Sequence, residues 1–154
     1  MSIEIERKFL VRGTAWKVPG QGAAIRQGYL SAHPDRTVRV RIEGVAATLT
    51  IKGRSRGAVR GEWEYPIPLQ DAEALLNGLC ERPLIEKTRY RVVHAGMTWE
   101  VDEFFGDNLG LVVAEIELSS EDQAFAKPDW AGEEVTHDSR YFNSSLQAHP
   151  YTQW

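Results

Sequence analysis

Residues 2–9 read S-I-E-I-E-R-K-F, and this stretch decides the fold. Charged side chains occupy every second position, at Glu4, Glu6 and Lys8. Apolar side chains fill the other parity, at Ile3, Ile5 and Phe9. A β-strand sends alternate side chains to opposite faces. The stretch therefore predicts a strand with one charged face and one apolar face.

The same alternation recurs along the chain and predicts eight strands. The first covers residues 1–11, and the others cover 25–31, 36–43, 46–53, 59–67, 84–93, 97–104 and 111–118. Short connections at 43–46 and 94–96 favour antiparallel hairpins. Helical signals are few: a helix over 71–80 capped by Asp71, a helical turn opened by Ser120 and Gln123, and a last helix capped by Asp138 with Phe142 and Leu146 on one face.

Two architectures satisfy this pattern. One is an open or rolled sheet with a wet charged face and an apolar face covered by helices. The other is a closed eight-stranded barrel whose charges line the lumen, with the apolar side chains facing outward under the helices. Acids gather on the first, seventh and eighth strands and bases on the third, fourth and sixth. This segregation favours the barrel, a mainly β (α+β) fold forming one domain over 1–154.

Composition limits the function classes. The chain has 154 residues with a net charge of −4, which argues against a general nucleic-acid partner. Its single cysteine, Cys80, excludes an internal disulfide and fits a reducing, cytoplasmic compartment. No signal peptide is expected, and the apolar runs are too short to span a bilayer, so we expect no membrane partner.

The charged parity suggests a site for a guest that carries both signs, such as a metal-bound polyphosphate. Three acidic pairs at i, i+2 spacing stand out: Glu4 and Glu6, Glu100 and Asp102, Glu115 and Glu117. Carboxylates suit hard cations such as Mg²⁺, whereas arginine and lysine suit phosphate oxygens. The matching bases are Lys8, Arg39, Arg41, Lys52, Lys87, Arg89 and Arg91. The competing interpretation is that each acid simply pairs with a nearby base.

The ordered motifs resemble the CYTH superfamily, the triphosphate tunnel metalloenzymes. They are EIERKF at 4–9, QGYL at 27–30, RVR at 39–41, TIK at 50–52, EWEY at 62–65, EKTRY at 86–90, WEVDEF at 99–104, AEIEL at 114–118 and VTHDSRYFNSSL at 135–146. The resemblance implies an eight-stranded tunnel that binds a triphosphate with Mg²⁺ or Mn²⁺. Short bacterial members look most similar, which implies a metal-dependent hydrolase of inorganic tripolyphosphate.

The resemblance also implies roles for individual residues. The implied metal ligands are Glu4, Glu6, Asp102, Glu115 and Glu117. The implied substrate contacts are Lys8, Arg39, Arg41, Lys52, Lys87 and Arg89, and Lys8, Tyr29 and Lys52 are the candidate catalytic residues. The roles of Glu62, Glu64, Glu100 and Arg140 stay open. So do thiamine triphosphatase or adenylate cyclase activity, a non-catalytic binding module, and the choice between a monomer and a homodimer.

Overall fold

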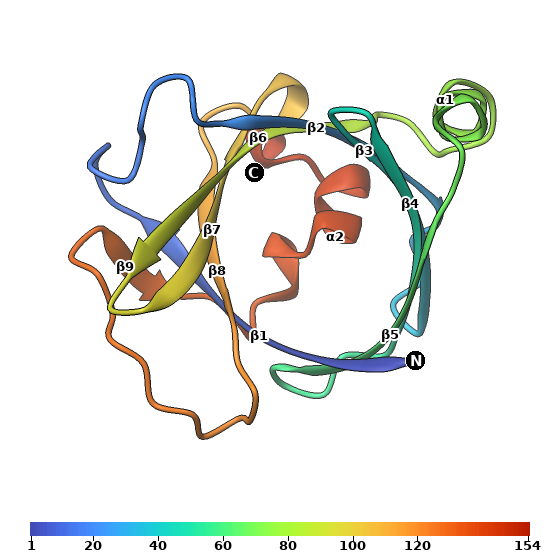
Figure 1. Cartoon of the computed structure of the whole chain (residues 1–154). Helices are drawn as coiled ribbons and strands as arrows, with labels where there is room; N and C mark the ends of the chain where they lie inside the picture. Colours follow the sequence, from blue (N-terminus) through green and yellow to red (C-terminus); the bar gives the residue numbers. More distant parts are fainter.

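The computed structural model describes all 154 residues and contains a closed antiparallel β-barrel. Its eight strands are β1 (Ser2–Val11), β2 (Ala23–Ser31), β3 (Arg36–Glu43), β4 (Ala46–Gly53), β5 (Val59–Pro66), β6 (Ile85–His94), β7 (Met97–Phe104) and β8 (Val112–Glu117). Neighbours run in the order β5-β4-β3-β2-β6-β7-β8-β1, and β1 pairs with β5 to close the ring. Figure 1 looks down this ring. The prediction of a closed eight-stranded barrel is confirmed.

A ninth strand, β9 (Ala131–Glu134), lies outside the ring and was not predicted. The first half of β1 pairs with β5 through Ser2–Ile5, and β9 pairs with its second half at Phe9 and Val11. The backbone N–H of Val135 donates to the carbonyl of Lys8, at 2.8 Å. β9 thus pairs with backbone of β1 that β5 does not reach.

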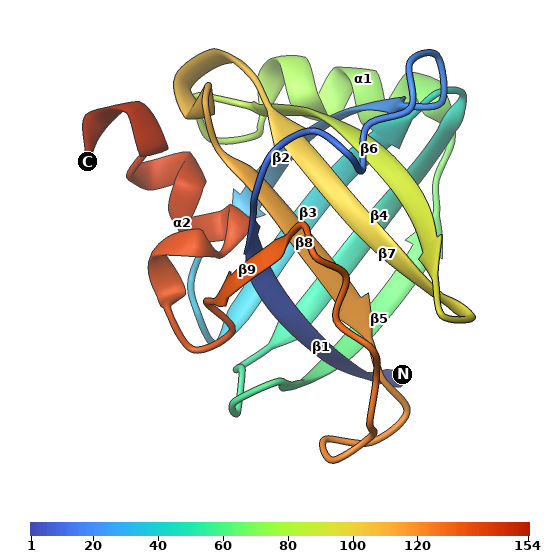
Figure 2. The ribbon, with the colours of Figure 1, turned by 90° about the vertical axis from the view of Figure 1, so that its left-hand side faces the viewer.

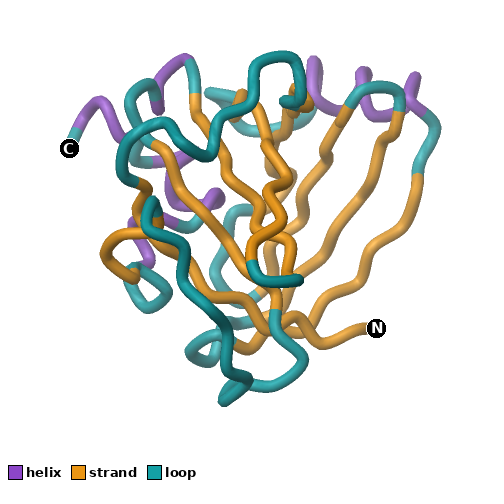
Figure 3. The backbone as a smooth tube through the Cα atoms, turned by 60° about the vertical axis from the view of Figure 1, so that its left-hand side comes forward, coloured by secondary structure: helices purple, strands orange, loops and turns teal.

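The apolar outer face of β1, β7 and β8 is covered by loops, which corrects the prediction of helices over it. Phe9 and Trp99 are buried there together with Trp16 from the loop after β1. The ring of Phe125, from the segment between β8 and β9, packs on Phe9 and Trp99 at 6.1 and 5.7 Å between centroids. Ile3 is 55% exposed, so the apolar row of β1 is covered at one end only. Figures 2 and 3 show loop segments crossing this wall.

Helix α1 (Leu69–Gly78) packs on the outside of the barrel, as predicted. It buries Ala72 and Leu76 against Val40 and Ala47 of β3 and β4, with Cys80 in the same cluster. The helix begins two residues before the expected Asp71. Its N-cap residue is Pro68, with no side-chain capping bond, so the predicted aspartate cap is wrong.

The C-terminal segment closes one mouth of the barrel. It consists of a 3₁₀ turn (Ser139–Tyr141), helix α2 (Asn143–Ala148) and a further 3₁₀ turn (Tyr151–Gln153). α2 projects onto the ring in Figure 1 and lies at one end of the strands in Figure 2. Asp138 caps the 3₁₀ turn by accepting from Arg140 N, whereas α2 itself starts at Asn143 without a side-chain cap. Leu146 of α2 is fully buried and anchors the helix to the apolar cluster that includes Ile85.

The predicted helical turn at Ser120 does not form. The side chain of Gln123 accepts instead from the backbone N–H and hydroxyl of Ser119, and the segment is a turn. A glutamine that satisfies the residue before the expected cap cannot complete a capping box, so this prediction is wrong. None of the helices is both long and apolar enough to cross a membrane.

Candidate functional site

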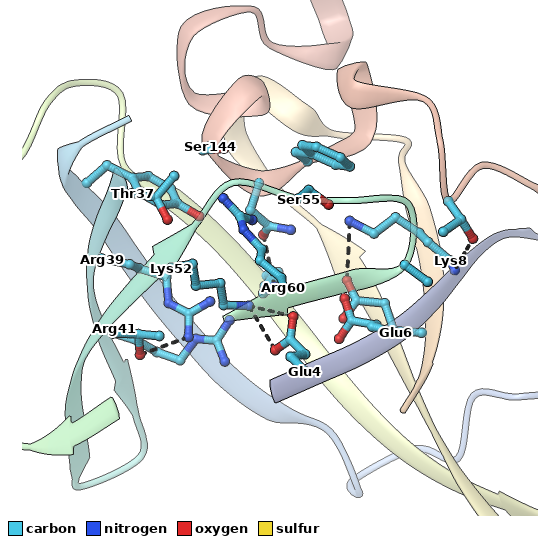
Figure 4. A pocket seen from close by; sticks show the side chains of 18 of the residues that line it. Glu4, Glu6, Lys8, Thr37, Arg39, Arg41, Lys52, Ser55, Arg60 and Ser144 are labelled. Carbon is cyan, nitrogen blue, oxygen red and sulfur yellow. Dashed lines mark hydrogen bonds and ion pairs between the residues drawn. The ribbon is translucent and has the colours of Figure 1, made fainter. Parts of the chain in front are cut away.

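A polar pocket fills the lumen of the barrel and reaches the mouth that the C-terminal segment closes (Figure 4). Only three of its 20 lining residues are hydrophobic. The charged lining residues are Glu4, Glu6, Lys8, Arg39, Arg41, Lys52, Arg60, Lys87, Arg89 and Glu115. The charged parity of the strands therefore faces the inside of the barrel. This excludes the open sheet with a wet charged face.

Antiparallel register explains which side chains surround the two lumen arginines of β3. Arg39 of β3 lies opposite Tyr29 of β2 and Thr50 of β4. One guanidinium nitrogen of Arg39 donates to the Thr50 hydroxyl at 3.2 Å, while its buried Nε has no partner in the protein. Arg41 lies one pleat further along β3, and burial together with Arg39 lowers its pKa to about 10. An unpartnered buried donor beside a second guanidinium is suited to an anionic guest.

Three carboxylates from β1 and β8 gather on the facing side. Glu6 is close enough to Glu115 and Glu4 that burial, then these two neighbours, raise the pKa of Glu6 well above its usual range. Burial would also raise the pKa of Glu4, but Lys52 and Glu62 together outweigh burial and lower that pKa. The Lys52 ammonium bonds both oxygens of Glu4 at 2.9 Å, and Lys8 lies 3.5 Å from Glu115. Bases and acids of the lumen thus neutralise one another.

Glu62 extends the acidic side along β5. It lies opposite Lys52 in the register of β4 and β5, and the Lys52 ammonium is 3.5 Å from its carboxyl. Burial, then the neighbouring Glu4, raises the pKa of Glu62 to about 7. A neighbouring carboxylate such as Glu4 disfavours the charged form of Glu62, which is the same direction as burial. Glu64 takes a neutral partner instead and accepts from the Thr50 hydroxyl at 3.1 Å.

A charged triad is buried in the barrel wall, with Lys87 and Arg89 lining the pocket. Asp102 accepts from Lys87 Nζ at 2.7 Å and from two nitrogens of Arg89 at 2.8 and 2.9 Å. Burial would raise the pKa of Asp102, but these two cations hold it far below its usual range. Burial lowers the pKa of Lys87 to about 7 despite its carboxylate partner. Asp102 itself does not line the pocket.

The C-terminal segment supplies the closed end of the pocket through Thr136, Phe142, Asn143 and Ser144. Lys8 Nζ donates to the backbone carbonyl of Tyr141 at 3.1 Å and lies 5.5 Å from the centre of the Phe142 ring. Thr136 accepts from the backbone N–H of Lys8 at 3.0 Å. The position of Lys8 is therefore tied to the segment that closes the mouth.

Ten of the twelve predicted site residues line the pocket, and Asp102 and Glu117 do not. Glu117 is opposite Glu6 in the register of β1 and β8, but Glu117 is exposed to solvent. Glu100 pairs with Arg89 and Arg91, and Arg140 pairs with Asp138 outside the pocket. Glu100 and Arg140 are therefore members of ordinary ion pairs.

Sequence reasoning missed Arg60, Asn143 and the donors of the closing segment. Arg60 shares the charged parity of β5 and lies opposite Glu4, so its alternation could have identified it. Its Nε donates to the carbonyl of Gly53 at 2.7 Å, which ties it to the base of the loop at 53–58. Asn143 lies outside the alternating strands, so no pattern in the sequence marks it. It reaches the lumen only because the C-terminal segment folds over the mouth.

The carboxylates of the lumen suit a divalent cation, although their present hydrogen bonds do not leave them arranged as a set of metal ligands. Glu4, Glu6 and Glu115 offer carboxylate oxygens on one side of the lumen, the ligands that Mg²⁺ and Mn²⁺ prefer. Burial, and then the neighbouring carboxyls Glu115 and Glu4, raise the pKa of Glu6, and a cation among these groups would favour its charged form. No group of three acidic side chains converges as they stand, since Lys52 and Lys8 bind two of them.

Comparison with known proteins gives consistent results. A family model described as "CYTH domain" matches residues 2–151. The chain is 52% identical over 151 residues to an inorganic triphosphatase of Acetivibrio thermocellus, covering 98% of this chain and 97% of that protein. It is 40% identical to an inorganic triphosphatase of Nitrosomonas europaea, covering 93% and 95%. The crystal structure of the inorganic triphosphatase NE1496 superimposes with a TM-score of 0.65 at 37% identity, covering 96% of this chain and 95% of that one.

Proposed function

The chain belongs to the CYTH domain family, and on this basis we propose that it is a metal-dependent hydrolase of inorganic tripolyphosphate. The observation that carries the proposal is the lumen, where basic side chains from five strands face a set of carboxylates inside one closed barrel. The near full-length similarity to two inorganic triphosphatases supports the same substrate.

The bases bind and orient the phosphate chain. Arg39, Arg41 and Arg60 carry guanidinium forks that match phosphate oxygens, and Lys87 adds an ammonium deeper in the wall. Lys8 and Lys52 are now held by Tyr141, Glu115 and Glu4, and a phosphate that enters the lumen offers them stronger partners. The transferring phosphoryl group then develops its charge among fixed cations, which is most of what such a reaction requires.

Glu4, Glu6 and Glu115 would hold Mg²⁺ or Mn²⁺ when the bound phosphates draw the lysines away. Such a cation would neutralise charge on the phosphoryl oxygens. We place Glu117 at the edge of this set, because it is opposite Glu6 in register but exposed. Asp102 is better explained as the buried counter-ion that positions Lys87 and Arg89, since both of its oxygens are already bonded to them.

Tyr29 is the one candidate catalytic residue without charge. It is 4% exposed, and it lines the pocket opposite Arg39 in the β2–β3 register. Its hydroxyl makes no hydrogen bond within the protein, so it is available to a phosphate oxygen or to the attacking water. All of these residues come from one chain, and we infer that a single chain carries a complete site.

A substrate panel tests the function. Phosphate release from tripolyphosphate, thiamine triphosphate and ATP is compared with Mg²⁺, with Mn²⁺ and with chelator. We expect the highest kcat/KM for tripolyphosphate, because both of its ends are charged and the lumen offers little apolar surface to a nucleoside. We expect no turnover in chelator, because the proposed reaction requires a divalent metal. A tenfold advantage for ATP or thiamine triphosphate, about 1.4 kcal/mol in transition-state binding, would overturn the substrate assignment.

A further inference from the structure

The hydrogen bonds of the Asn143 side chain fix the orientation of its amide. Its Oδ1 atom accepts from Gln27 Nε2 at 2.9 Å and from Lys87 Nζ at 3.0 Å. Gln27 is fully buried, and its Oε1 atom accepts from Arg41 Nε at 2.7 Å. The network therefore joins two bases of the lumen to the C-terminal segment through two amides.

Hydrogen-bond polarity allows only one orientation for each amide. An arginine side chain can only donate, so the oxygen of Gln27 must face Arg41 and its nitrogen must face Asn143. The oxygen of Asn143 must then face Gln27, and Lys87, which donates in its charged form, requires the same orientation independently. The nitrogen Nδ2 of Asn143 takes no part in these hydrogen bonds.

That nitrogen has no partner within the protein, and Asn143 lines the pocket beside Lys8 and Lys87. Its two N–H groups are donors at the closed end of a lumen that is otherwise furnished with cations. The Asn143 amide is not among the buried polar atoms without a partner, so Nδ2 is open to solvent in a residue that lines the pocket. A donor held this way by two separate partners is pre-organised for an acceptor in the lumen.

We propose that Asn143 is a substrate-contacting residue, whose Nδ2 donates to a phosphate oxygen of the bound polyphosphate. This inference rests on the proposed function for the identity of the guest. It assigns the closing segment a direct part in binding: the segment covers the mouth and also recognises the phosphate chain. Arg41 and Lys87, which hold Gln27 and Asn143 in place, then position this donor as well as binding the substrate.

The Asn143→Asp substitution separates contact from support. Aspartate keeps an oxygen to accept from Gln27 and Lys87, so the network and the fold survive. Its second oxygen replaces the free donor with a negative acceptor that faces the phosphate. We expect the Kd of tripolyphosphate to rise about tenfold or more, the factor that corresponds to about 1.4 kcal/mol, while the melting temperature is unchanged or higher. Asn143→Ala also removes the donor, and the same weakening is expected from it.

Binding is measured by calorimetry in chelator, where no turnover is expected, and KM is measured separately with Mg²⁺. The matched control is Ser145→Asp, which adds the same charge two residues further on, where the side chain does not line the pocket. We expect this control to stay within twofold of the wild type. An equal loss in the control would assign the effect to long-range charge and overturn the inference, as would a Kd within twofold in both Asn143 variants.

The two proposals fail in different ways. A wild-type chain that binds tripolyphosphate without hydrolysing it would overturn the proposed function and leave the calorimetric test of Asn143 intact. A wild-type chain that neither binds nor hydrolyses tripolyphosphate would overturn both. Hydrolysis by the wild type together with unaltered binding by the Asn143 variants would overturn the contact alone.

Discussion

Asp102→Asn removes the buried carboxylate that bonds both Lys87 and Arg89 in the barrel wall. Asp102 is 2% exposed and accepts three hydrogen bonds from the two cations. The asparagine side chain has almost the same volume, but one of its two polar atoms is a donor and must face another donor. Removing one partner of a buried ion pair costs about 3–5 kcal/mol, because the remaining charge is buried without compensation.

The expected change in melting temperature follows from chain length. A domain of 154 residues has an unfolding entropy that converts each kcal/mol into about 3 °C. Asp102→Asn should therefore lower the melting temperature by about 10–15 °C, measured by calorimetry or circular dichroism. The pKa of Lys87, already lowered to about 7, should fall further once its opposite charge is gone.

Two comparisons check the reasoning behind this prediction. Glu103→Gln removes a carboxylate one residue further along β7 whose partner, Lys17, is exposed, and its effect should be small. Combining Asp102→Asn with Lys87→Met removes one of the orphaned charges, so the double variant should be more stable than Asp102→Asn alone. A melting temperature for Asp102→Asn within 3 °C of the wild type would refute the role of Asp102 as a buried counter-ion.

Three further predictions concern the acidic side, the basic side and the outer wall. Without metal, Glu62 has a raised pKa of about 7. The protonated carboxyl therefore stabilises the folded state fully below the pKa that Glu62 has in the unfolded chain, and this stabilisation is lost as pH rises towards 7. The melting temperature in chelator should fall over that range, and a Glu62→Gln variant with the same fall would contradict this assignment. Arg60→Ala should raise KM for tripolyphosphate about tenfold or more through loss of a charge-assisted contact, and an unchanged KM would exclude that contact. Leu76→Ala should cost about 2–5 kcal/mol of stability and leave KM unaltered, since α1 packs outside the barrel; a changed KM would show that the wall transmits strain to the lumen.

The barrel could be predicted because alternation is a local property of each strand. Glu4, Glu6 and Lys8 mark one face of β1, and six other strands repeat this charged parity. The segregation of acids from bases then favoured the closed barrel over the open sheet. Ten of twelve predicted site residues line the pocket for this reason. The alternation shows which face of the strand a side chain occupies, but it does not show how deeply that side chain is buried. That is why Asp102, which is on the correct face, lies beneath the pocket surface with its oxygens already bonded.

Other features depend on tertiary contacts that alternation does not encode. β9 has only four residues, A-G-E-E, and pairs because β1 offers it free backbone. Trp16 and Phe125 are single aromatic residues in non-periodic loops, and only the folded chain shows that they cover Phe9 and Trp99. The contact of Asn143 with the lumen likewise depends on where the end of the chain folds.

The most direct test of the account is a crystal structure of the protein with tripolyphosphate and Mn²⁺, using the anomalous signal of manganese to locate the metal. The account predicts the phosphate chain inside the barrel in contact with Arg39, Arg41 and Lys52, and an anomalous peak beside Glu4 and Glu6. Lys52 should have left Glu4 for a phosphate oxygen. Phosphate bound on the outer surface, or an empty lumen with manganese elsewhere, would contradict the central claim that the charged interior is the binding site.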